Sequence, residues 1–142
     1  MPDLMNRNSF KNLTRIRLRE ARALLRYKLY DGAYYLCGYA IECALKACIA
    51  KKTKKFDFPP KPKIINDIYT HSMNQLVKVA GMDTMLSTEM SASDKFASNW
   101  AVVKDWTEES RYEKHDEMQA KSLYSAVTSR KHGVLKWIRL HW

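Results

Sequence analysis

Residues 31–51 read DGAYYLCGYAIECALKACIAK, and this stretch decides the fold class. Apolar side chains recur in it at spacings of three and four residues, which is the period of an α-helix with one face in a protein core. The positions on that face are Ala33, Leu36, Cys37, Ala40, Ile41, Ala44, Leu45, Cys48 and Ile49. We therefore predict a core helix from Asp31 to about Lys51, with a turn at Asp31-Gly32 leading into it.

A second stripe lies beside the first on the same helix, formed by Tyr35, Tyr39, Glu42 and Lys46. Glu42 precedes Lys46 by four residues, the favourable order for an ion pair along a helix. The two tyrosines either pack at a seam between helices or stack against nucleic-acid bases. Because two stripes are one more than a monomeric core needs, we expect a homodimer whose interface involves this helix or the last one.

The rest of the chain is also helical in pattern. Further helices are expected at about 10–28, 70–81, 83–90, from Ser93 to about 104, and 116–140. The first should bury Leu13, Ile16, Ala23, Leu24 and Tyr27. No segment shows the alternation typical of strands. We predict one all-α domain over residues 1–142, an up-and-down bundle of four or five helices.

Residues 51–63, KKTKKFDFPPKPK, interrupt this pattern. Their prolines are incompatible with a helix interior, so we predict a long connection here. Its lysines, among them Lys51, Lys52, Lys54 and Lys55, form either an arm that contacts RNA or a solvated linker.

Charge is the strongest indication of function that composition provides. The formal net charge is +10, and basic residues gather in 1–28, 51–63 and 130–142, whereas 104–117 is acidic. Such clustering suits RNA, DNA or nucleotide phosphates, although many helical proteins also carry solvated basic faces.

The three cysteines, Cys37, Cys43 and Cys48, share one helix, and no secretory signal is apparent. We expect free thiols and a cytoplasmic protein. The apolar runs are too short to span a membrane. No glycine-rich phosphate loop, metal-ligand spacing or nucleophile signature is present, so no cofactor or metal is expected.

Three patches resemble one known family. Residues 31–47 are similar to the second helix of the HEPN (higher eukaryotes and prokaryotes nucleotide-binding) family. His71 with Leu76 resembles the H-x-L-x-x-L that follows its central loop, with Met73 in place of the middle leucine. Ser110-Arg111-Tyr112 resembles the RY that precedes its last long helix.

The resemblance implies a helical bundle that is usually a homodimer. Many members are ribonucleases, with an Arg and a His four to six residues apart at the dimer cleft. Others lack the pair and bind RNA or nucleotides, often as partners of a small nucleotidyltransferase. For this chain we expect an RNA- or nucleotide-binding role, within a toxin–antitoxin or phage-defence module, and the alternatives are a non-catalytic partner of a nucleotidyltransferase or an active metal-independent ribonuclease. Here Arg111 and His115 are separated by only three residues, in acidic surroundings. We therefore expect weak ribonuclease activity or none.

The candidate catalytic residues are Arg111 and His115, with Glu42 orienting Arg111. Arg111 serves either as the partner of an acid such as Glu42 or as a phosphate ligand. His115 is either solvated or catalytic. His71 is expected to cap a helix start. The candidates for binding nucleic acid or nucleotide are Lys46, Tyr39, Tyr112, Lys51, Lys52, Lys54 and Lys55.

Overall fold

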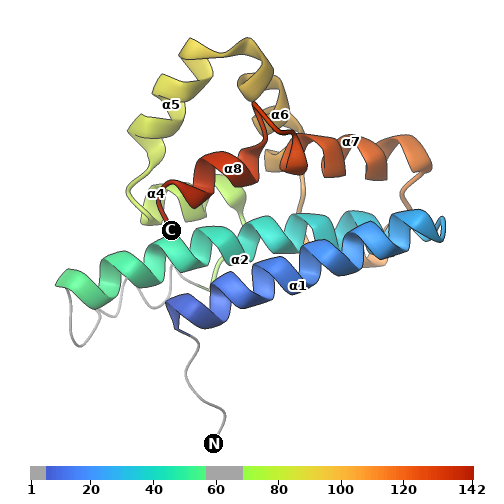
Figure 1. Ribbon diagram of the computed structural model, residues 1–142, viewed down its shortest axis with the longest axis horizontal. Helices are drawn as coiled ribbons and strands as arrows, with labels where there is room; N and C mark the ends of the chain where they lie inside the picture. Colours follow the sequence, from blue (N-terminus) through green and yellow to red (C-terminus); the bar gives the residue numbers. More distant parts are fainter. Residues whose placement is uncertain (1–5, 57–68) are drawn as a thin grey trace, which may run out of the picture.

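The computed structural model describes residues 6–56 and 69–142. Two long antiparallel helices, α1 (Arg7–Arg26) and α2 (Tyr30–Phe56), lie side by side, and the remaining helices cross above α2 (Figure 1). These are α4 (Met73–Val79), α5 (Asp83–Ala92), α6 (Asp94–Lys104), α7 (Glu117–Thr128) and α8 (Val134–Arg139), with a 3-10 helix, η1 (Glu108–Tyr112), between α6 and α7. The prediction of an all-α fold is confirmed. The described residues form seven α-helices rather than four or five, because several are shorter than expected.

Helix α2 is the centre of the core. From Cys37 to Ile49 every residue is buried except Tyr39 and Lys46, which are half-buried. A helix that is covered on most sides needs little solvated polar surface, which explains why apolar residues extend so far around α2. The second stripe is covered by the same chain. It therefore gives no reason of its own to expect a dimer.

The contact between α1 and α2 uses a different face of α1 from the one expected. Thr14 and Ala21 are fully buried, whereas Ile16 and Tyr27 are exposed. Small side chains let two helices approach closely, and the Thr14 hydroxyl is satisfied by donating to the Phe10 carbonyl at 2.8 Å. The buried face of α1 was predicted from the spacing of mostly large apolar residues, so the contact made by the small residues was missed.

Two predicted element boundaries were wrong. Helix α2 continues through Lys51–Phe56, because lysines are good helix formers and the first proline comes only at residue 59. Residues 57–63 of the expected connection lie outside the described residues. The expected last helix is broken between Thr128 and Val134, where the chain folds tightly enough that a Cβ on Gly133 would lie 2.4 Å from the Ser129 carbonyl oxygen.

The three tryptophans expected in the core are found there. Trp100, Trp106 and Trp137 are buried, and Ser93 caps α6 by accepting from the Phe96 amide at 3.1 Å. All three cysteines are buried and free. Burial raises the pKa of Cys43 and Cys48 to about 12, so these thiols are unreactive core groups. None of the helices in the described part of the chain is long and apolar enough to cross a membrane.

Gly38 allows the Trp106 indole to lie directly on α2. A Cβ at residue 38 would come within 2.2 Å of the Trp106 ring. We expect Gly38→Ala to cost about 3 kcal/mol through overpacking, more than the ~1 kcal/mol gained in helix propensity. Gly32→Ala is the matched control on the same helix, because its nearest new contact is the flexible end of Leu24 at 3.1 Å. Urea denaturation measures both. Equal stability of the two variants would contradict this account of Gly38.

Candidate functional site

A carboxylate in the middle of α2 organises the polar interior. Glu42 is 1% exposed. Its Oε2 lies 3.2 Å from the Lys46 ammonium, one turn along the helix, and its Oε1 lies 2.7 Å from Nδ1 of His71. A buried charge is tolerated only when it is paired and hydrogen-bonded, and Glu42 meets both conditions.

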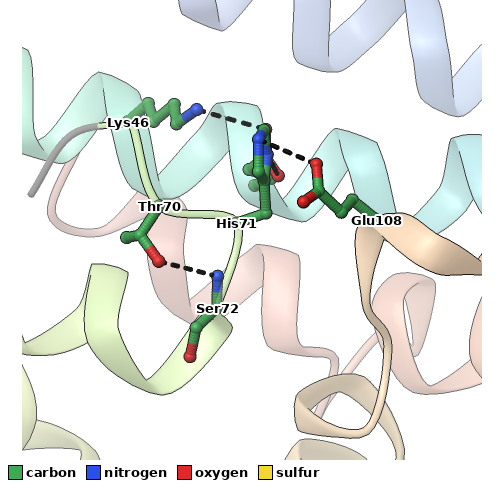
Figure 2. Close-up of polar contacts among 6 residues, drawn as sticks. Lys46, Thr70, His71, Ser72 and Glu108 are labelled. Carbon is green, nitrogen blue, oxygen red and sulfur yellow. Dashed lines mark hydrogen bonds and ion pairs between the residues drawn. The ribbon is translucent and has the colours of Figure 1, made fainter.

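His71 connects three parts of the chain. Its Nε2 lies 2.9 Å from Glu108 of η1, so each ring nitrogen faces a carboxylate (Figure 2). Only a doubly protonated ring donates to both. The expected helix cap is supplied by the next residue, since Ser72 accepts from the Gln75 amide at the start of α4. His71 therefore fastens the entry to α4 and the 3-10 helix onto α2.

The tyrosines of the second stripe pack beside this cluster. Tyr35 stacks on Tyr39 with ring centroids 6.1 Å apart and on Trp106 at 5.9 Å. Burial raises the pKa of Tyr39 to about 12, with smaller contributions from Cys43 and Glu42. Both tyrosines are half-buried, as packing at a seam requires. This arrangement favours the packing alternative over base stacking.

Arg111 lies in η1 and is exposed, with its guanidinium 5.0 Å from the ring of Tyr112, itself 79% exposed. The pKa of Arg111 is raised by Tyr112 and then by Tyr35, which places the guanidinium beside both rings. No hydrogen bond or ion pair joins Glu42 to Arg111 within the described residues, and the Glu42 oxygens contact Lys46 and His71 instead. The expected contact was wrong because a histidine 29 residues away in the chain occupies that place.

One alternative was that His115 is solvated, and the structure does not support it. Its ring stacks on Tyr34 with centroids 3.7 Å apart, and its side chain is 7% exposed. The backbone amide of His115 donates to the Asp31 carboxylate. Neither ring nitrogen has a hydrogen-bond partner among the described residues, and Nε2 lies 3.8 Å from Glu113.

Arg111 and His115 therefore approach different faces of α2. Arg111 lies beside Tyr35, and His115 lies on Tyr34. Successive helical side chains point about 100° apart, so Tyr35 and Tyr34 place Arg111 and His115 on different sides of α2.

Lys51, Lys52, Lys54 and Lys55 belong to α2 rather than to a loop. Lys51 and Lys52 are exposed on the last turns of α2, and the side chains of Lys54 and Lys55 lie outside the described residues. The Lys52 ammonium lies beside Gly81, just beyond the C-terminal end of α4, where a cation complements the helix dipole. The Lys52 side chain therefore lies against the end of α4. Lys51 lies near Lys11, whose pKa it helps to lower.

Several cations gather around Trp142, which the sequence alone does not place. Lys11, Arg15 and Arg139 lie 5.1, 5.3 and 5.5 Å from its ring centre, and Arg7 donates to its carbonyl oxygen. The spacing of four residues between Arg7, Lys11 and Arg15 was visible in the sequence. Their contact with Arg139 and Trp142 depends on the tertiary fold, which brings the two ends of the sequence together.

A comparison with protein families decides the classification. The model of the HEPN domain family matches residues 14–140. The chain belongs to the HEPN family. It matches no curated protein and no solved structure.

The three HEPN-like patches of the sequence converge on one place in the fold. Glu42 and Lys46 come from the second helix, His71 from the patch before α4, and Arg111 from the patch in η1, the element that also carries Glu108. Within the described residues no cluster of His, Cys, Asp or Glu has a metal-binding arrangement. The motif residues of this HEPN domain thus form an ion-paired cluster, with Arg111 at its exposed edge.

We expect Glu42→Ala to destabilise the fold by about 2–3 kcal/mol, because it removes the charged hydrogen-bond partner of both Lys46 and His71 and leaves a gap in the core. Glu117→Ala removes an exposed Glu–Lys pair with the same four-residue spacing, formed with Lys121, and should change stability little. Chemical denaturation of both variants tests the difference. A Glu42→Ala protein as stable as the wild type would show that the cluster does not hold the fold.

Proposed function

We propose that this HEPN domain binds RNA through its phosphates, along the exposed face of α1, and does not cleave it. The supporting observation is an uncompensated basic stripe on α1: Arg7, Lys11, Arg15, Arg19, Arg22 and Arg26. These residues are three or four positions apart and so share one side of the helix. Within α1 the one ion pair is Arg17–Glu20, which lies off this stripe.

The dimensions of the stripe suit a chain of phosphates. Nineteen residues separate its ends, so it extends for roughly 28 Å at 1.5 Å per residue. Guanidinium groups bind phosphate oxygens in a bidentate manner, and five of the six cations are arginines. Charge does not distinguish RNA from DNA, and RNA is proposed on the basis of the family.

The homodimer, a nucleotidyltransferase partner, a cytoplasmic location and a role in a toxin–antitoxin or phage-defence module stay predictions. They rest on the family resemblance and on the cysteine pattern.

Binding of a mixed-sequence single-stranded RNA should weaken steeply as salt is added, since neutralised phosphates release counterions. The double variant Arg19→Gln/Arg22→Gln should bind more weakly and reduce the slope of log K against log salt by about 1 to 1.5. The control is Lys78→Gln/Lys95→Gln, which removes the same charge from exposed positions on α4 and α6. Fluorescence anisotropy measures each affinity. Identical salt slopes for the two double variants would refute the α1 surface.

The wild-type protein should not cleave a defined RNA beyond the background of a His115→Ala sample purified in the same way. The physical reason is that Arg111 and His115 approach different faces of α2 and that the enclosed His115 ring cannot reach a 2′-hydroxyl. A gel-based cleavage assay compares wild type, Arg111→Ala and His115→Ala. Robust cleavage that either substitution abolishes would make the protein an active ribonuclease.

A further inference from the structure

One end of the α1 stripe differs from the rest, because cations from three helices meet there. Arg7, Lys11 and Arg15 come from α1, Lys51 from the last turns of α2, and Arg139 from α8. Lys11, Arg15 and Arg139 all lie within 5.5 Å of the centre of the Trp142 ring. We call these five cations and Trp142 the Trp142 cluster. In Figure 1 the C-terminus lies over α2, on the side where α1 begins.

The cluster brings five cationic side chains together, and one of them, Arg7, donates to the main-chain oxygen of Trp142. The pKa of Lys11 is lowered by burial and then by Arg7, Arg15 and Lys51, so Lys11 is repelled by three neighbouring cations. The pKa of His141 is also lowered, by burial and then by Lys51. No Asp or Glu of the described residues forms an ion pair with any of the five cations.

The cluster also contains an unused donor. Nε of Arg7 is buried and has no hydrogen-bond partner among the described residues. An unsatisfied buried donor and a group of mutually repelling cations are both relieved by the same kind of ligand, a compact anion with several acceptor oxygens.

We propose that the Trp142 cluster is a phosphate-binding site that anchors one phosphate of the bound RNA more tightly than the rest of the α1 stripe does. The proposal rests on the RNA-binding function for the source of the phosphate. The Trp142 ring is already covered by cations, so its role is to position Lys11, Arg15 and Arg139 rather than to stack on a base.

Two double variants with equal charge changes test the anchor. Lys11→Gln/Arg139→Gln removes cations from the cluster, and Arg22→Gln/Arg26→Gln removes them from the other end of the stripe. The first should weaken single-stranded RNA binding by about tenfold or more, because hydrogen bonds between charged groups are lost there. The second should weaken it about two- to threefold. Because the first relieves repulsion, its melting temperature without ligand should equal or exceed that of the wild type, which separates lost binding from unfolding.

A second arm uses inorganic tripolyphosphate in place of RNA and follows the melting temperature. Tripolyphosphate should stabilise the wild type and the Arg22→Gln/Arg26→Gln variant, but not the cluster variant. An oligoglutamate peptide of comparable charge serves as the non-phosphate anion and should have little effect.

The outcomes separate this proposal from the broader function. If RNA binds the wild type and both double variants lose affinity equally, the anchor is refuted while RNA binding stands. If RNA does not bind but tripolyphosphate stabilises the wild type through the cluster, the RNA function fails and the phosphate site is supported with free phosphates as its ligand. Failure of both ligands, or equal stabilisation by oligoglutamate, overturns the site.

Discussion

Glu42 lies in the middle of a helix that its own chain surrounds, and a carboxylate in that position must be paired. Lys46 provides one partner from the next turn of α2, and His71 provides the other from the segment that enters α4. His71 in turn binds Glu108, so the neutralisation of one buried charge determines where two further segments lie. Glu42 is the buried member of this network, whereas His71 and Glu108 lie partly at the surface, so the network fixes a charge that could not stay unpaired in the core.

The packing around α2 follows from the same centre. Gly38 lets Trp106 lie against the helix one turn before Glu42, and Trp106 stacks on Tyr35. Together these contacts hold the chain between α6 and η1 close to α2. Arg111 is consequently held at the surface beside Tyr35 and Tyr112, while His115, four residues later, turns back onto Tyr34. The positions of both groups result from packing on α2.

Acidic and basic charges are used differently in this molecule. Acidic Glu42 and Glu108 are held in contact with cations inside the fold or at its edge. Most arginines of α1 instead remain on an outer face, and some converge with Lys51 and Arg139 at one end. The buried charges are therefore paired, whereas the basic face of α1 is not. This is the electrostatic arrangement expected of a protein that binds a polyanion.

The helical period of residues 31–51 was sufficient to predict an all-α fold with α2 in its core. Three short sequence patches indicated the HEPN family. Both predictions depend on local spacing, which the sequence shows directly. Sequence spacing also showed the Glu42–Lys46 pair and the Arg-rich face of α1. It did not show that His71 pairs with Glu42, because His71 was expected to act locally at a helix start and only the packed chain brings these distant residues together. The face of α1 that packs on α2 was missed because Thr14 and Ala21 bury little apolar surface. The Trp142 cluster joins residues up to 135 positions apart, and only the tertiary structure brings them together, since local periodicity carries no information about where a chain returns.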